Sequence, residues 1–588
     1  MSEHDAAAEV LVAVTLREPG EPVSATAIRE ALALHLDHSV SPTAPGASGD
    51  LLVPVMREEL TAAIEALLEL DATHVMLTAF CLAGPRVGRS PRVQAGLAVE
   101  EVMAVPNGPL VRLRIVRPAD DPSYQSITPL VPAAQWDERE ARDLHGVTPV
   151  GHPDPRPLVI HDAGTTPASA AAPASSSAAT PASADAAVPS PYAPPPAAPA
   201  APEPTVPPTT APTVPDVAPY RSFVAHGDGV YQLPVGPIHA GVIEPGHFRF
   251  SAVGESVLYL DARLFYAHRG IERMVEGRPF AGALPVIERA CGVCTVTHAT
   301  AYSRAVEELT GTVPPARAQM GRVLLAEMER LYNHVGDLGN ICAGVGFNYG
   351  ISRLGFQKER LLRLNERLTG HRYLMGVVAP GGLRLELDER GLVGLGSLVT
   401  DIEHEVRATV RHIVRSEGVM NRLHTTGILT NAEARRLGAL GVAARASGQA
   451  CDLRIDRPTD GYREIQVASV GASSGDVAAR FHVRAQEVGV SAAIVADLAG
   501  RIPDGEISVP LGREPRSGEV ALAGAEGPRG ASWIWLMAGP KGTVARLHLR
   551  SASFANWPIV AAVVPGNIVP DFPLINKSFE LCYACTDR

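Results

Sequence analysis

Two short stretches decide how the chain must fold: Arg289-Ala290-Cys291-Gly292-Val293-Cys294 and Cys582-Tyr583-Ala584-Cys585-Thr586-Asp587-Arg588. Each contains a Cys-x-x-Cys pair, and two thiolates at this spacing can bind one metal ion. Residues 295–581 separate the two pairs. The part of the chain that contains them must therefore fold back on itself if all four thiols are to meet.

Composition limits the class of protein. The chain has 588 residues, 46% of them hydrophobic, which is enough to bury cores in several domains. Its net charge of −11 argues against nucleic acid as a partner. The seven cysteines are too few, and odd in number, for a secreted disulfide framework. Because there is no secretory signal and no apolar run of about 18 residues, we expect a cytoplasmic chain that reaches a membrane only through partners.

The first unit, residues 1–162, is predicted to be a small α+β domain. Glu9–Thr15 is a short apolar run that indicates a buried strand, and Val111–Val116 alternates as a half-buried strand does. Between them, Arg57–Leu70 has apolar residues at helical spacing. Residues 163–219 are almost entirely Ala, Pro, Ser, Thr and Val, which predicts a disordered linker.

The second unit, residues 220–588, is predicted to be a large, mainly α domain with β edges. Strand-like segments at Val230–Leu233 and Phe248–Phe250 open it, and short strands and loops are expected from Arg501 to the end. Long periodic segments between them predict helices at Thr297–Leu309, Ala316–Val335, Arg353–Leu368 and Ser397–Val419. Both cysteine pairs lie in this unit.

The four thiols by themselves leave the metal open. A structural zinc site is the first alternative, since zinc is often held by four cysteines. The pairs of such sites usually lie ~15–20 residues apart within one small module, unlike these. Soft thiolates also suit other transition metals, so the spacing does not choose among them.

Several motifs resemble known families. Arg289-x-Cys291-Gly292-x-Cys294-x-x-x-His298 and residues 582–588 resemble the two cysteine motifs of the nickel–iron hydrogenase large subunit, in the energy-converting, formate hydrogenlyase-like group. Residues 9–162 resemble the 30-kDa subunit of respiratory complex I, and residues 220–588 resemble its 49-kDa subunit. Further segments that agree in order and spacing are Glu138–Gly146, Gly151–Arg156, Glu244–His247, His268–Glu272 and Glu526–Gly530.

The resemblance implies a nickel–iron centre. Cys294 and Cys585 would bridge nickel to an iron that carries cyanide and carbon monoxide, and Cys291 and Cys582 would bind nickel alone. His298, four residues after Cys294, would hydrogen-bond near the ligands rather than bind metal.

Three charged residues also receive roles from the resemblance. Arg529 would place its guanidinium over the open face of the metals, and Glu244 would carry protons to the surface. Glu272 resembles a carboxylate beside a structural magnesium. The structural alternatives are an ion pair that holds a turn for Arg529, a surface carboxylate for Glu244, and a salt bridge to Arg269 or Arg289 for Glu272.

Two departures from the family pattern concern the last motif. Glu580-Leu581 stand where most hydrogenases have Asp-Pro, so Glu580 is a candidate replacement for that aspartate. The sequence stops at Arg588, which corresponds either to a mature form or to a gene without the extension that many large subunits lose. The histidine that binds magnesium in other classes is absent, which weakens the magnesium expectation.

The leading functional hypothesis is the catalytic large subunit of a membrane-associated hydrogenase that interconverts H2 with two protons and two electrons. Electrons would pass to an iron–sulfur small subunit like the complex I 20-kDa protein. Membrane subunits would hold the complex at the cytoplasmic face, and residues 1–162 would dock the electron-transfer subunits. The alternatives are a complex I-like subunit of NADH/quinone oxidoreductase type without hydrogen chemistry, and a zinc-stabilised scaffold. Two complete cysteine pairs favour the metal enzyme.

Overall fold

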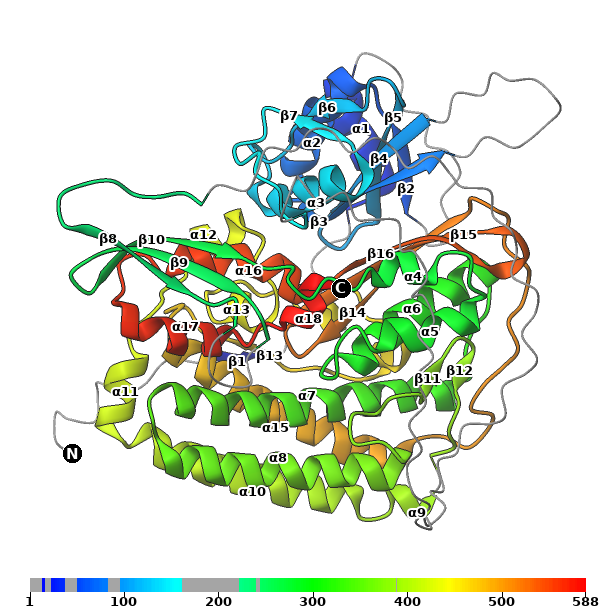
Figure 1. Ribbon diagram of the computed structural model, residues 1–588. Coiled ribbons are helices and arrows are strands. Elements are labelled where there is room, and N and C mark those ends of the chain that lie inside the picture. Colours follow the sequence, from blue (N-terminus) through cyan, green and yellow to red (C-terminus); the bar gives the residue numbers. More distant parts are fainter. Residues whose placement is uncertain are drawn as a thin grey trace, which may run out of the picture.

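The computed structural model describes residues 13–15, 23–36, 50–82, 96–160, 222–238, 244–387 and 389–588. A small N-terminal domain lies against one side of a larger domain, and the long helices of the larger domain are stacked on the side away from it (Figure 1). The expected linker at residues 163–219 lies outside the described residues, so its disorder and its boundaries stay predictions.

The N-terminal domain is built on a four-stranded sheet with the order β2-β5-β4-β3. Helices α1 (Ala25–His35) and α2 (Leu60–Leu68) contribute to the core on one face of it. The predicted helix begins as a 3₁₀ turn at Arg57–Glu59 before α2, and the predicted strand Val111–Val116 lies within β5. The α+β expectation for this domain is therefore confirmed. The strands are β2 Leu51–Pro54, β3 Thr73–Leu82, β4 Gly96–Ala104 and β5 Leu110–Pro118.

The other face of this sheet packs on the large domain. Successive side chains of a strand point to opposite faces, so Leu77 and Ala79 enter the core under the helices, whereas Met76 and Phe80 face the large domain. The ring of Phe80 lies 4.8 Å from that of Trp535 on β15 (Gly530–Ala538). An apolar contact of this kind makes the two domains one packed body.

One predicted strand joins a different partner. Residues 13–15 of the expected strand Glu9–Thr15 form β1 (Ala13–Thr15), which pairs antiparallel with β13 (Ser469–Gly471) of the large domain. Residues 9–12 lie outside the described residues. The predicted strand of the first unit thus pairs with the large domain, because a short apolar run specifies a strand but not the edge on which it pairs.

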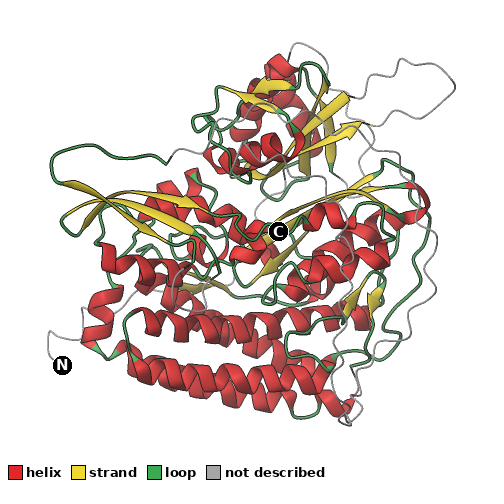
Figure 2. Ribbon diagram, viewed as in Figure 1, coloured by secondary structure: helices red, strands yellow, loops and turns green. Residues whose placement is uncertain are grey.

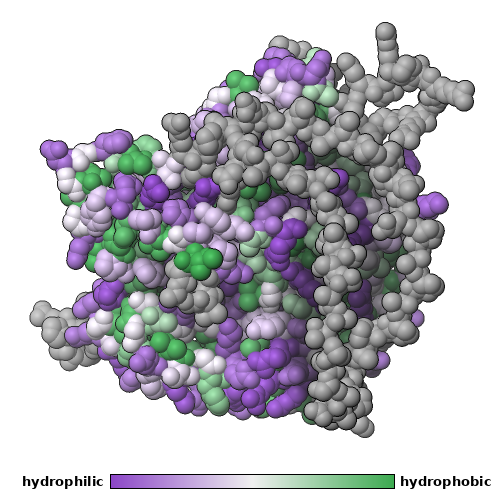
Figure 3. Space-filling model, viewed as in Figure 1, coloured by the Kyte–Doolittle hydropathy of each residue, from purple (hydrophilic) through white to green (hydrophobic). Residues whose placement is uncertain are grey.

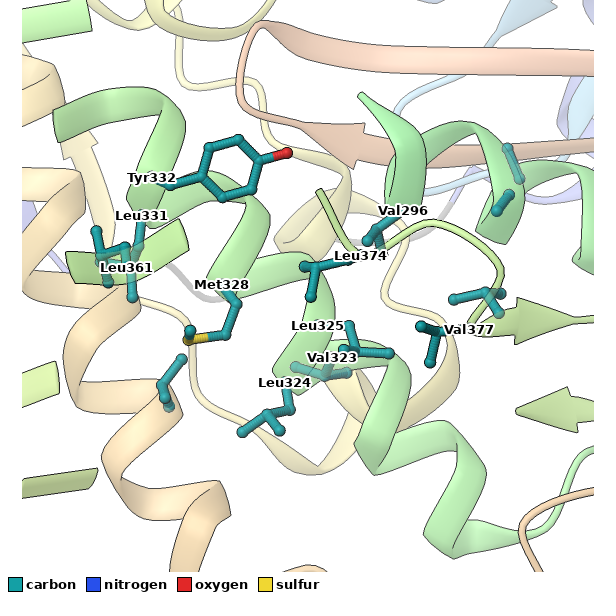
Figure 4. Close-up of a cluster of buried hydrophobic side chains, with 14 of the residues drawn as sticks. Val296, Val323, Leu324, Leu325, Met328, Leu331, Tyr332, Leu361, Leu374 and Val377 are labelled. Atoms are coloured by element: carbon teal, nitrogen blue, oxygen red, sulfur yellow. The ribbon is translucent and has the colours of Figure 1, made fainter. Parts of the chain in front are cut away.

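A bundle of long helices forms the side of the large domain away from the N-terminal domain (Figures 1 and 2). Side chains of α7 pack there against α6 and α8, as Met328, Leu361 and Val296 show in Figure 4. The expected helix Ser397–Val419 is broken, because α10 ends at Val414 and α11 begins after Ser416. The helices are α6 Thr295–Thr310, α7 Ala316–Gly344, α8 Asn348–Thr369, α10 Leu395–Val414, α11 Glu417–Leu423 and α15 Val477–Arg501.

Two antiparallel sheets form the expected β edges, with the orders β10-β9-β8 and β14-β15-β16. The segment after Arg501 is not confined to strands and loops, because three helices follow the second sheet. The sequence analysis did not predict α16 and α17, because Pro558 lies inside α16 and Pro573 at the start of α17, and proline usually argues against a helix. The elements are β8 Val230–Val235, β9 His247–Val253, β10 Ser256–Arg263, β14 Val520–Gly527, β16 Val544–Arg550, α16 Ala552–Val563, α17 Phe572–Phe579 and α18 Tyr583–Asp587.

Shorter elements connect these parts. They are β6 Ser123–Gln125, α3 Gln135–His145, β7 Thr148–Val150, α4 Ile271–Val275, α5 Phe280–Glu288, β11 Val378–Ala379, β12 Gly382–Leu383, α9 Glu389–Leu392, α12 Asn431–Arg436, α13 Gly441–Arg445 and α14 Leu453–Asp456. No helix among the described residues is both long and apolar enough to cross a membrane. The face in Figure 3 intermixes polar and apolar residues outside its grey atoms.

Candidate metal centre

The fold brings the two cysteine pairs together. Cys294 is the residue before α6 and Cys582 the residue before α18, so each pair lies at the start of a helix. The sulfurs of Cys291, Cys294 and Cys585 all lie within 4.8 Å of one another. Cys582 joins this cluster, and its sulfur accepts a hydrogen bond of 3.3 Å from the backbone N–H of Cys585.

An arginine ties the two cysteine segments to each other. The Nη2 of Arg269 donates to the carbonyl of Ala290, beside the first pair, at 2.7 Å, and to the carbonyl of Ala584, inside the second, at 2.8 Å. Asp587 accepts hydrogen bonds of 2.9 Å from the N–H groups of Phe265 and Ala267. These contacts fix a five-residue helix that would be unstable alone.

The donor set fits a soft metal ion. Cys291, Cys294 and Cys585 are buried, and Cys582 is partly buried. Burial and the neighbouring thiols raise the pKa of Cys291 and of Cys585 well above the usual value. A cation is therefore needed to hold all four as thiolates, and four thiolates suit nickel, iron or zinc.

Arg529 lies beside these cysteines on the turn between β14 and β15. Its Nε donates to the carbonyl of Glu580, its Nη1 donates to Oδ1 of Asn333 at 3.0 Å, and its Nη2 lies 3.7 Å from Asp337. Burial opposes the charge, but Asp337 and Cys294 raise the pKa of Arg529 well above its usual value. The site therefore holds a fixed cation near the thiols.

Helix α7 supplies residues that the sequence analysis missed. Glu329, Asn333 and Asp337 recur every fourth residue and so lie along one stripe of the helix. Glu329 accepts from the N–H of Val296 at 2.7 Å, and Asn333 donates to the carbonyl of Val293 at 2.9 Å. Burial and the Cys294 thiolate raise the pKa of Glu329 to about 8. The four-residue spacing of these polar residues was the available signal.

Glu244 lies at the outer side of the second cysteine pair. Its Oε2 accepts a hydrogen bond of 2.9 Å from the N–H of Ala584 and lies 4.0 Å from the sulfur of Cys582. Partial burial and the Cys582 thiolate raise the pKa of Glu244 above its usual value. A solvent-exposed carboxylate in contact with a thiol can pass a proton between that thiol and water.

Glu272 does not fit a magnesium site. Its Oε2 accepts from Arg546 at 3.0 Å, and its Oε1 accepts from Arg588 at 3.0 Å and lies 3.1 Å from Nδ1 of His548. Burial would raise the pKa of Glu272, but these three groups hold it well below the usual value. Cationic donors thus already neutralise both oxygens, and the partners differ from the expected Arg269 or Arg289.

His298 and Glu580 flank the cysteines. His298 is fully buried, and its Nε2 lies 4.0 Å from the sulfur of Cys585, a position suited to orienting that sulfur. The carboxylate of Glu580 hydrogen-bonds the amide of Asn340, and burial with Asp337 raises the pKa of Glu580 to about 8. Arg529 donates a hydrogen bond to the backbone carbonyl of Glu580, and the carboxylate that pairs with its guanidinium is that of Asp337.

Family models match most of this architecture. Residues 350–517 and 511–588 match the respiratory-chain NADH dehydrogenase 49 Kd subunit, and residues 53–177 match the 30 Kd subunit. Residues 269–338, which include the first cysteine pair, match nickel-dependent hydrogenase.

Curated relatives carry hydrogenase names. Formate hydrogenlyase subunit 5 of Escherichia coli is 34% identical over 480 residues, which cover 81% of this chain and 79% of that protein. Hydrogenase-4 component G of the same organism is 33% identical, with 80% and 77% covered. A chain from the solved membrane-bound sulfane sulfur reductase, an archaeal respiratory membrane complex, is 25% identical with a TM-score of 0.57, covering 61% of this chain and 99% of that chain.

The cysteine cluster and the matches of both domains agree with the hydrogenase names of these relatives. The expected resemblance to a hydrogenase large subunit with fused complex I 30-kDa-like and 49-kDa-like parts is thereby confirmed. The chain belongs to the formate hydrogenlyase subunit 5-like family of nickel-dependent hydrogenases, which are oxidoreductases related to complex I.

Proposed function

We propose that this chain is the catalytic large subunit of a membrane-associated nickel–iron hydrogenase that interconverts H2 with two protons and two electrons. The observation that carries the proposal is the convergence of two cysteine pairs from distant parts of the sequence, three of whose sulfurs lie within 4.8 Å of one another. The nickel-dependent hydrogenase match over the first pair supports nickel and iron.

Cys291, Cys294, Cys582 and Cys585 would hold the nickel and iron of the centre. When bound, the centre supplies the heterolytic cleavage of H2 and the storage of its electrons. The sulfur of Cys582 holds a proton during turnover, and Oε2 of Glu244 receives it and exchanges it with water.

Arg529 acts as a fixed positive charge. Asn333 and the Glu580 carbonyl orient its guanidinium before the reaction begins, so no reorganisation is needed when charge develops beside it. His298 holds Cys585 in place, and the Glu329 carboxylate holds the turn that starts α6.

Electrons leave through a partner in this proposal. Cys81, Cys342 and Cys451, the cysteines outside the two pairs, do not cluster in the described residues, so the chain offers no set of ligands for an iron–sulfur cluster there. We infer an iron–sulfur small subunit of the complex I 20-kDa type and membrane subunits that hold the complex at the cytoplasmic face. Relatives are named as subunits of larger complexes, among them the alpha subunit of a membrane-bound hydrogenase of Pyrococcus furiosus, which supports further subunits.

The second candidate is a complex I-like subunit without hydrogen chemistry. The 49 Kd and 30 Kd matches favour it, and relatives include a subunit of the NADH-quinone oxidoreductase of Syntrophobacter fumaroxidans at 29% identity. Quinone chemistry requires no cysteine, however, and it would leave the buried four-thiol cluster without a use.

Metal analysis combined with infrared spectroscopy of the native complex tests the proposal. The hydrogenase predicts nickel and iron bound to the chain, together with absorption bands of cyanide and carbon monoxide that shift under H2. Zinc alone would support a scaffold, and no metal would support the complex I-like alternative; either result overturns the proposal.

A further inference from the structure

The junction between the two domains contains a buried set of charged side chains beside its apolar contacts. Arg546, His548 and Arg550 alternate along β16 and so present one face, and that face meets α3 of the N-terminal domain. Nε of Arg550 donates to Asp137 at 2.8 Å, and Nη2 of Arg546 contacts Nε2 of His145 at 2.8 Å. Charged groups are buried in this way only when they are paired.

Arg588 adds a third contact and joins both domains. Its Nη1 donates to Glu272 of the large domain at 3.0 Å, and its Nη2 donates to Glu140 on α3. The guanidinium carbon lies 4.7 Å from the centre of the Phe554 ring, and that ring lies 5.7 Å from the ring of Trp136 on α3. Arg588 is 1% exposed, so its charge depends on these partners.

Arg588 directly follows the helix that carries the second cysteine pair. Helix α18 begins after Cys582, contains Cys585 and ends at Asp587, one residue before Arg588. A five-residue helix has too few internal hydrogen bonds to fix its own position, so its outside contacts, those of Arg588 together with those of Arg269 and Asp587, decide where Cys585 lies. One of the two carboxylates that hold this end, Glu140, belongs to the other domain.

We propose that Glu140 is a positioning residue of the metal centre: through Arg588 it holds α18, so that docking of the N-terminal domain and closure of the cysteine site are coupled. The inference rests on the proposed metal function of the four cysteines. Arg588 also pairs with the carboxylate of Glu272, which the sequence analysis had assigned to magnesium.

The charge balance explains why Glu140 is needed. Arg546, Arg550 and Arg588 face Asp137, Glu140 and Glu272, and Arg546 also lies 3.9 Å from Glu276. The substitution Glu140→Gln leaves Arg588 with Glu272 alone, and Glu272 already accepts from Arg546.

Removing one partner of a buried ion pair is strongly unfavourable, so the end of α18 should open more often. Deleting residues 1–162 should therefore disturb the metal site as well as assembly. The sequence analysis expected this domain only to dock electron-transfer subunits.

The test uses the purified complex with wild-type, Glu140→Gln and Glu140→Asp chains. Amide hydrogen exchange of residues 582–588 is measured together with nickel per chain and the infrared bands. Glu140→Gln should raise exchange in residues 582–588 at least about tenfold and should lower nickel content or shift the bands. Glu140→Asp keeps the charge and should restore most of the protection.

The matched control is Trp535→Phe. It removes the interdomain hydrogen bond of 2.8 Å from Trp535 to Glu100 and does not touch α18. Loss of one hydrogen bond should leave the domains docked, so positioning through Glu140 predicts that exchange in residues 582–588 stays as in the wild type. Unchanged exchange in Glu140→Gln, or an equal rise in Trp535→Phe, would overturn the inference, because Glu140 would then only join the domains. A wild-type complex without nickel would instead overturn the proposed function, while the exchange data would still decide the coupling.

Discussion

The substitution Arg529→Lys separates the charge of this residue from its geometry. Lysine keeps the cation but ends in a single nitrogen on a flexible chain. It cannot bond the Glu580 carbonyl and Asn333 while also lying beside Asp337, as the three nitrogens of Arg529 do. We expect the ammonium to move towards Asp337, the one anion of the three, and away from its place beside the thiols.

The magnitude follows from these contacts. Loss of one preorganised donor at a reacting centre lowers kcat by ~10²–10³, or ~2.7–4 kcal/mol. Two hydrogen bonds from the charged guanidinium, to Asn333 and to the Glu580 carbonyl, are lost at about 1.5–3 kcal/mol each, so the free energy of unfolding should fall by about 3–6 kcal/mol. Nickel should be retained, because the cysteine segments are held by Arg269 and Asp587 instead.

The assay is H2-dependent reduction of a dye by the purified complex, with nickel measured on the same sample. Arg513→Lys is the matched control, since Arg513 pairs with Glu519 at the surface and its loss should matter little. Activity of Arg529→Lys within about threefold of the wild type, with nickel retained, would refute the argument that the fixed guanidinium takes part in turnover.

Four further substitutions test other parts of the site and of the domain junction. Glu244→Gln keeps an acceptor for the N–H of Ala584 but cannot carry a proton, so H2 turnover should fall about 10²-fold with nickel retained, whereas the exposed Glu255→Gln should behave as wild type. Gly441→Ala should lower activity at least about tenfold, although position 441 bears no catalytic side chain. The φ of Gly441 is +60°, and a Cβ there would lie 2.2 Å from the carbonyl oxygen of Arg529. The control is Gly418→Ala, because a Cβ at position 418 would meet open space. Asp337→Asn leaves the buried Arg484 and Arg529 without their carboxylate and should lower the free energy of unfolding by about 3 kcal/mol in a denaturant titration, and a change below about 1 kcal/mol would contradict the pairing. Burial works against the charge of His74, but Glu101 and Asp137 raise its pKa to about 9. The stabilisation by His74 is therefore complete below about pH 6.5 and is lost as the pH rises through 9. Denaturant titrations at both ends of this range should show the loss in the wild type and not in His74→Gln.

The pattern of the sequence predicted the elements better than their partners. Helices α6, α7 and α8 appear where apolar residues recur at helical spacing, because that period is a local property of the chain. Helix α15 was missed, since buried arginines such as Arg480 and Arg484 interrupt its apolar pattern. Their partners are backbone carbonyls and Asp337, which no local pattern reveals.

Some residues of the candidate site could be predicted from the sequence, and others could not. The cysteine motifs and the segments of Glu244 and Arg529 can be found from the sequence because each is a short pattern of consecutive residues. Glu329, Asn333 and Asp337 needed the structure, since nothing in α7 alone shows that their stripe faces the cysteines. The partners of Glu272 also needed the structure: Glu272 matched a motif, but Arg546 and Arg588, which pair with it, lie in distant segments of the sequence.

The sequence by itself determined the four thiols, their family and the two-part architecture, because these depend on residue type and spacing along the chain. Only the tertiary structure decided which charges meet across the fold. Arg588 and Glu140 lie far apart in the sequence, yet they share one buried ion pair beside the second cysteine motif. A buried charge requires a partner, but its identity depends on how the two domains pack.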